Sequence, residues 1–207
     1  MKKLRMIRNI VLLLIFINII VIGGYFIYLK NNKEEKKPEE VLVVDEIKDF
    51  NYVLDNSNND YYKSLFEELK TVLLEEEVNY EEYAKSISKL FISDLYTLSN
   101  KVSSSDVGGI EFVYKDFQKD FLSIAKTTLY NSVKSNLYGE RVQELPTVTN
   151  VNADSVSKTT FKYKDTTYEE AYLVKVSIEY EKDLGYSKSC ELVLVKNENV
   201  LEVAKLS

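Results

Sequence analysis

The chain contains no histidine, and this absence narrows its chemistry more than any residue that is present. Histidine is the usual general base near neutral pH and the commonest metal-binding side chain. Without it, the chain cannot by itself form a Ser-His or Cys-His nucleophile pair or a His-x-x-x-His metal site. We therefore expect no catalytic residue, no metal site and no cofactor, and a protein that is not an enzyme.

Cysteine, proline and glycine are also scarce. The single cysteine, Cys190, leaves no partner for an intramolecular disulfide and no thiolate set for a zinc site. Only 2 prolines and 6 glycines occur in 207 residues, which excludes collagen-like and low-complexity sequences. Because 45% of the residues are hydrophobic and 29% are charged, the composition is typical of a folded domain. Cys190 is expected to serve as a small apolar core side chain.

A long apolar run stands near the start of the chain. Residues 10–29 are almost wholly apolar and are interrupted only by Asn18, two glycines and two tyrosines. A helix of this length, at about 1.5 Å per residue, spans roughly 30 Å, the thickness of a hydrocarbon core. The run is longer than the apolar core of a cleaved signal peptide, which is the main alternative. We expect a transmembrane helix that binds the lipid bilayer.

The charges around this run predict its orientation. Residues 1–9 contain four basic side chains and no acidic one, whereas residues 30–40 contain four lysines and four glutamates. Basic flanks stay in the cytoplasm, so residues 1–9 are predicted to be a basic cytoplasmic tail. Residues 30–40 are predicted to be a charged, solvated tether. The remaining domain, residues 41–207, is then expected to be extracytoplasmic, on a single-pass protein of the cell membrane.

The first half of residues 41–207 shows mainly helical periodicity. Part of residues 41–54 is predicted to be a strand, and an oxygen-rich loop at residues 55–60 ends in a helix N-cap signal. Apolar faces at helical spacing then follow, and Asn79 with Glu82 forms a capping-box pattern. The three helical faces cover residues 65–73, 79–98 and 114–129. The third helix is expected to bury Phe117, Phe121, Ile124, Ala125, Thr128 and Leu129.

From about Val142 the apolar period changes from that of a helix to that of a strand. Asp183 to Gly185 carries a hairpin-turn signal. The predicted strands are residues 155–163, 168–180, 187–195 and 200–205. The expected fold class is therefore α+β: a single N-terminal transmembrane helix, then about three helices packed on a curved antiparallel sheet of about four strands.

The predicted layout of tail, span, tether and domain resembles known protein architectures. Helices followed by a long curved meander resemble the cone-shaped fold of the nuclear-transport-factor-2-like superfamily. The whole layout also resembles the bitopic scaffold subunits of type IV secretion and conjugation machines. The segments Asp106-Val-Gly-Gly-Ile-Glu-Phe-Val-Tyr114 and Asp183-Leu-Gly-Tyr186 are similar to pieces of an uncharacterised family of membrane-anchored proteins from low-GC Gram-positive bacteria. That family implies no activity. The Asp-His pair that enzymes of the cone-shaped fold use has no counterpart in a chain without histidine.

The frequent tyrosines, 16 in number, suggest one candidate ligand site. Tyr168, Tyr172 and Tyr180 share a predicted strand face with Glu170. If that face is the concave side of the sheet, three phenols and one carboxylate would line a ligand-binding pocket. The alternative, which we favour, is that these are ordinary half-buried residues of a sheet.

Charge excludes one class of partner. The four basic residues that precede the span leave 23 of the 27 basic residues for residues 30–207, against all 33 acidic ones. Such an acidic segment is not expected to bind nucleic acid. Carboxylate runs such as Glu75–Glu77 are expected to be solvated, and the loop at residues 55–60 is expected to cap a helix rather than to bind a metal. We expect a non-enzymatic interaction or scaffold domain with protein partners in the envelope; a small-ligand-binding module is the alternative.

Overall fold

The computed structural model describes residues 18–25, 28 and 41–207, and the chain divides into two units between Glu39 and Glu40. In the first unit, residues 18–25 are helical, and the apolar side chains from Ile19 to Ile22 are more than half exposed. Within the described residues, no helix is both long enough and apolar enough to cross a bilayer. The predicted tail, the tether and most of the predicted span lie outside the described residues.

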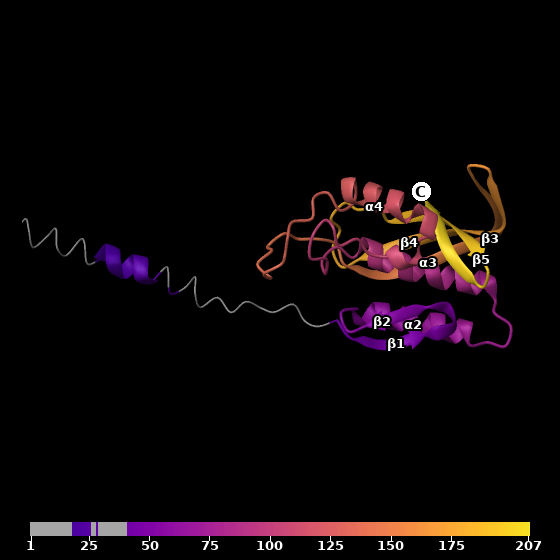
Figure 1. The fold of residues 1–207 in the computed structure, drawn as a ribbon, viewed down its shortest axis with the longest axis horizontal. Helices are drawn as coiled ribbons and strands as arrows, with labels where there is room; N and C mark the ends of the chain where they lie inside the picture. Colours follow the sequence, from indigo (N-terminus) through magenta and orange to yellow (C-terminus); the bar gives the residue numbers. More distant parts are fainter. Residues whose placement is uncertain (1–17, 26–27, 29–40) are drawn as a thin grey trace, which may run out of the picture. The chain divides into compact units, whose positions relative to one another are not determined.

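The second unit confirms an α+β domain with helices and a four-stranded antiparallel sheet (Figure 1). The sheet is a meander in which each strand pairs with the next along the chain, as the alternation predicted. Short 3-10 turns connect several elements. In chain order the elements are β1 (Val43–Ile47), β2 (Tyr52–Asp55), α2 (Asp60–Leu73), α3 (Tyr80–Tyr96), α4 (Gln118–Thr127), β3 (Val148–Tyr163), β4 (Thr166–Tyr180), β5 (Ser189–Asn197) and β6 (Val200–Leu206).

Asparagine side chains start the first two helices of this unit. The side-chain oxygen of Asn79 accepts hydrogen bonds from the N–H groups of Glu81 and Glu82, at 3.1 and 3.3 Å. These bonds satisfy N–H groups that the first turn of a helix leaves without a partner. In a capping box the Glu82 carboxylate would accept from the N–H of Asn79; here it pairs with Lys85 at 2.7 Å. Asn59 caps α2 in the same way as Asn79 caps α3.

The strands β3 and β4 form a long antiparallel hairpin that bends. Their register shifts at three places, near Val148, Ala153 and Thr159. A β-bulge inserts an extra residue on one strand and increases the local twist, which accounts for the bend. β3 begins at Val148, seven residues before the predicted start, because its first half lacks a clean alternation of apolar and polar residues. The observed bounds of β4 and β6 agree closely with the predicted ones.

The helix α3 occupies the centre of the core. It makes most of the helix contacts with the sheet, while α2 packs on α3 and β1 pairs with β2, so α3 lies between the sheet and the layer that holds α2 (Figure 1). Leu90 and Phe91 are fully buried, and so is the serine Ser88. The Ser88 hydroxyl donates to the carbonyl of Ala84 at 2.8 Å, which satisfies a polar group in an apolar layer.

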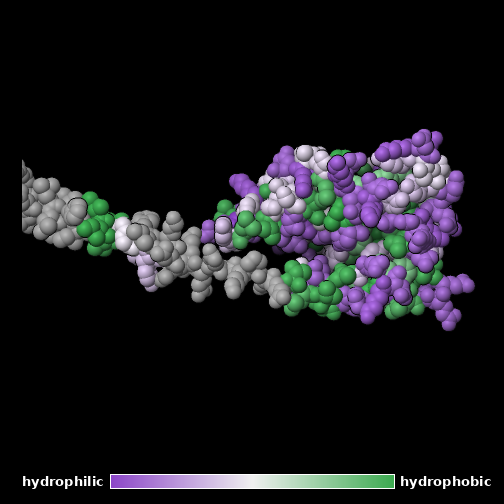
Figure 2. Space-filling model, viewed as in Figure 1, coloured by the Kyte–Doolittle hydropathy of each residue, from purple (hydrophilic) through white to green (hydrophobic). Residues whose placement is uncertain are grey.

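The hairpin of β1 and β2 confirms the predicted strand in residues 41–54 and adds a second one. Ile47, Tyr52 and Leu54 point into the core. Several other apolar side chains of this segment are exposed: residues 41–44 are 55% to 65% exposed, and Val53 is 50% exposed. Figure 2 shows this apolar surface gathered over the hairpin, on a domain whose visible surface is otherwise mostly hydrophilic.

Candidate functional site

The residues predicted to line a ligand pocket lie on β4 in separate surroundings. The Tyr168 ring packs edge-on against Tyr114, with centroids 5.7 Å apart. Glu170 is exposed and forms an ion pair with Lys196 at 3.1 Å. An exposed pair of this kind adds little to the stability of the domain.

The other two predicted residues are part of the folded core and of a turn. Tyr172 is 4% exposed and belongs to the hydrophobic core. The Tyr180 hydroxyl donates to the carbonyl of Ser187 at 2.7 Å, which ties β4 to the turn before β5. Tyr168 and Tyr180 stand twelve residues apart on one strand, or roughly 40 Å at 3.3 Å per residue. One small ligand therefore cannot touch all four side chains.

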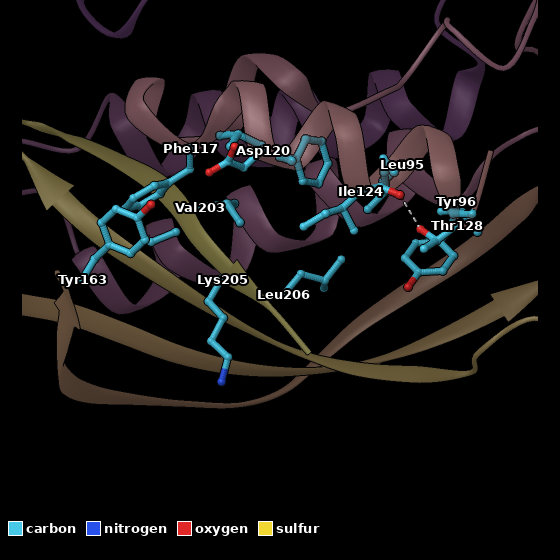
Figure 3. A pocket seen from close by; sticks show the side chains of 15 residues that line it. Leu95, Tyr96, Phe117, Asp120, Ile124, Thr128, Tyr163, Val203, Lys205 and Leu206 are labelled. Atoms are coloured by element: carbon cyan, nitrogen blue, oxygen red, sulfur yellow. Dashed lines mark hydrogen bonds between the residues drawn. The ribbon is translucent and has the colours of Figure 1, made fainter. Parts of the chain in front are cut away.

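An apolar cavity of about 450 Å³ lies elsewhere, between α4 and β6 (Figure 3). We call it the α4–β6 groove. The helix α4 forms one wall and the edge strand β6 forms the other, while Leu95 and Tyr96 from the end of α3 lie at one end of the groove (Figure 3). Its lining residues are Leu95, Tyr96, Val113, Phe117, Asp120, Phe121, Ile124, Ala125, Thr128, Leu129, Tyr163, Val203, Ala204, Lys205 and Leu206.

The groove stays open because α4 buries less of its apolar face than the sequence predicted. Ile124 is 62% exposed and Thr128 is also exposed, so the prediction that both are buried is wrong. The helix packs against α3 through Phe121 and Phe91, whose ring centroids lie 5.8 Å apart. This contact covers one side of the apolar face of α4 and leaves the side toward β6 without a covering layer.

Charge and polarity in the α4–β6 groove are low. Asp120 and Lys205 are its charged lining residues, of opposite sign. The Thr128 hydroxyl is already used, because it donates to the carbonyl of Ile124 at 2.7 Å. Burial raises the pKa of Tyr96 to about 12, so its phenol stays neutral. The groove therefore offers mainly apolar contacts to a binding partner.

A polar cleft of about 430 Å³ forms on another part of the domain, around the C-terminal end of α3. One Asp94 oxygen pairs with Lys101 at 2.5 Å, and the other accepts from the N–H of Gly109 at 2.6 Å. The Lys101 and Asp94 side chains are 8% and 16% exposed, so the pair is largely shielded from water. Both oxygens of Asp94 are thus engaged in holding the loop that follows α3.

Three further carboxyl groups line the cleft, those of Asp55, Asp106 and Glu111, and the pKa of Glu111 is strongly shifted. Burial of the carboxyl, and then repulsion by Asp94, raise its pKa to about 7. The Glu111 residue as a whole is nevertheless exposed, because the cleft is open to solvent on one side. Tyr62 donates a long hydrogen bond to it at 3.4 Å. Of the other lining carboxylates, Asp55 accepts from the N–H of Ser57 and Asp106 accepts from the N–H of Val102, both at 2.8 Å. Because these bonds and those of Asp94 hold loops in place, we assign the cleft a structural role.

The glycine pair 108–109 allows the loop to approach α3 closely. A Cβ atom on Gly108 would lie 2.4 Å from the carbonyl oxygen of Asp94, and Gly109 has a φ of +74°. The Tyr130 hydroxyl accepts from the N–H of Gly108 at 3.0 Å and donates to the carbonyl of Leu95 at 2.7 Å. A glycine pair in a sequence is typical of a turn, but it does not indicate that the turn packs against a helix.

Two further predictions concern reactive groups. Cys190 is half-buried beside the core, and burial raises the pKa of its thiol to about 12, so it is no nucleophile at neutral pH. In the loop at residues 55–60, the Asn58 side chain accepts from the N–H of Asp55, and Asn59 caps α2, as a capping loop would. Within residues 18–25, 28 and 41–207, no cluster of three or more carboxylate or cysteine side chains is placed to hold a metal.

No protein-family model, no curated protein and no solved structure matches the chain.

Proposed function

We propose that this chain is a membrane-tethered, non-enzymatic interaction domain on the outer side of the cell membrane, and that its α4–β6 groove binds a protein partner of the envelope. The observation that carries the proposal is the exposed Ile124 in an apolar groove of about 450 Å³. Soluble domains cover most of their apolar surface, so a contiguous open apolar site marks a binding surface. Aromatic side chains at both ends of the groove are the anchors that interfaces favour.

The membrane tether in this proposal rests on the sequence. Residues 10–29 have the length and apolarity of a membrane span, and the basic residues before them favour a cytoplasmic N-terminus. The helical conformation of residues 18–25 inside that run agrees with this assignment. A scaffold subunit of a cell-envelope assembly would have this layout of anchor, tether and binding domain.

Photo-crosslinking in cells that express the protein tests this function. A photo-reactive amino acid at Ile124, in the groove, should give a discrete crosslinked protein in the membrane fraction. The same amino acid at Leu74, which is 72% exposed but lies after α2, is the matched control and should give none. The proposal fails if Ile124 yields no protein adduct, or if the chain does not sediment with membranes.

A small-ligand-binding module is the second candidate. The groove volume of about 450 Å³ lies within the range of small-molecule sites, about 300–1,000 Å³, and its lining is mainly apolar. The residues that line the groove differ from the site predicted on β4: Tyr163 lies at one end of the groove, whereas Tyr172 does not line it. Native mass spectrometry of the chain released from membranes should show a bound small molecule that Ile124→Asp removes. A mass equal to that of the bare chain contradicts this candidate.

A further inference from the structure

The strand β6 forms one edge of the four-stranded sheet. It pairs with β5 on its inner side. There, Glu191 and Ser207 exchange both backbone hydrogen bonds, at 2.8 and 2.9 Å. Bonded and non-bonded residues alternate along an antiparallel pair. The N–H and C=O of Leu206 therefore point away from β5, out of the edge of the sheet, beside the α4–β6 groove that Leu206 lines.

The chain already adds a short extended segment to this edge. Val113 forms a parallel bridge with Val203, and the N–H of Tyr114 donates to the carbonyl of Val203 at 3.0 Å. After Tyr114 the chain turns into residues 115–117 and then α4, so the added segment ends there. Beyond Val203, the edge of β6 faces α4 across the groove. The result is a slot with a strand edge on one side and a helix on the other.

We propose that this slot takes a short extended segment of a partner protein as an added strand beside β6, with alternate apolar side chains in the groove. This inference rests on the proposed function and specifies its partner. A segment added in this way satisfies the outward backbone groups of Leu206, whereas a purely apolar small molecule would leave them without partners. The part of the edge that residues 113–114 leave open, Ala204 to Leu206, is roughly 10 Å long, which corresponds to about three residues of added strand.

Charge further defines the segment. The lining contains one carboxylate, Asp120, and one ammonium group, Lys205. Because these charges balance, the slot neither attracts nor repels a net charge, and desolvating a charged side chain inside it would be unfavourable. The recognised segment is therefore uncharged over the residues that enter the slot, with β-branched or aromatic residues at alternate positions.

The test is selection of random heptapeptides displayed on phage against the full chain in lipid nanodiscs. Enriched peptides should be uncharged and should alternate apolar with polar residues. Leu206→Pro removes the outward N–H at an edge position where proline is tolerated, while Leu206→Val keeps it. Synthetic copies of the enriched peptides should bind Leu206→Pro at least tenfold more weakly than Leu206→Val. Unchanged circular dichroism and unfolding midpoints would verify that both variants are folded.

Two results would overturn the added-strand inference. One is the recovery of no enriched peptide. The other is equal binding of the enriched peptides to Leu206→Pro and Leu206→Val, which would mean that only side chains are recognised. Either result leaves the proposed function standing if the photo-reactive group at Ile124 still captures a membrane partner. Loss of that capture overturns the proposed function itself, so the two failures are distinguishable.

Discussion

At the scale of single residues, the ion pair of Asp94 and Lys101 fixes the loop that follows α3. We expect Lys101→Met to lower the free energy of unfolding by about 3 kcal/mol, because it leaves a shielded carboxylate without its cation. Lys188→Met is the matched control. It breaks the pair with Asp183, whose side chains are 63% and 66% exposed, and should leave stability nearly unchanged. Urea unfolding followed by circular dichroism measures both, and equal effects would contradict the structural role of the cleft.

Glu111 predicts a pH dependence of stability. Its pKa in the folded chain, about 7, lies above the ordinary value of 4.5, so folding favours the protonated form. The stability that this carboxyl contributes to the folded chain is fully present below about pH 4.5 and is lost as the pH rises through about 7. Glu111→Gln stays neutral and should therefore become more stable relative to the unchanged chain between pH 4.5 and 7.5. A constant difference in unfolding free energy over that range would show that the carboxyl is not perturbed.

The approach of Gly108 to α3 gives a third prediction at this scale. Gly108→Ala places a Cβ atom against the backbone of Asp94 and should destabilise the domain by about 2 kcal/mol. Gly139→Ala is the comparison. It has open space around it and carries only the strain of a φ of +70°, which is about 1 kcal/mol. In thermal unfolding, Gly108→Ala should therefore have a lower midpoint than Gly139→Ala. A lower midpoint for Gly139→Ala would refute the close packing of Gly108 against α3.

At the scale of elements, α4 is the helix whose position decides whether the α4–β6 groove is open. Its adjacent residues Ile124 and Ala125 are 62% and 6% exposed. Ile124→Lys should change the free energy of unfolding by less than about 0.5 kcal/mol, because the side chain reaches solvent. Ala125→Lys should lower it by about 2 kcal/mol or more, because it buries a charge. Chemical denaturation checks both, and a large loss in Ile124→Lys would mean that the groove is closed in solution.

The same helix shows where prediction from sequence ends. The spacing of Phe117, Phe121 and Ile124 correctly identifies a helix with one apolar face. It cannot tell how much of that face a neighbour covers, because coverage depends on where α3 and β6 lie. For β4, alternation put Tyr172 on one strand face with Tyr168 and Tyr180, but it did not show that Tyr172 is buried in the core. The ligand site proposed on that strand joined Tyr168 and Tyr180, two residues that an extended backbone keeps far apart.

At the scale of the whole molecule, residues 41–207 carry a complete hydrophobic core of their own. Deletion of residues 1–29 should therefore give a folded, monodisperse domain that no longer sediments with membranes. Circular dichroism and gel filtration would measure its fold and its size, and membrane flotation would compare it with the full chain. A deleted chain that still floats with vesicles would locate a membrane-binding surface in the domain and would contradict the anchor.

The sequence by itself determined the elements of this protein, because helical and alternating periods, asparagine caps and turn residues act over a few neighbouring positions. The sequence also determined that this chain supplies no histidine side chain for acid–base chemistry or metal binding. Only the tertiary structure decided the sites. The α4–β6 groove, the Asp94–Lys101 pair and the contact of Gly108 with α3 join residues from separate elements, and their distances depend on packing that no local pattern specifies.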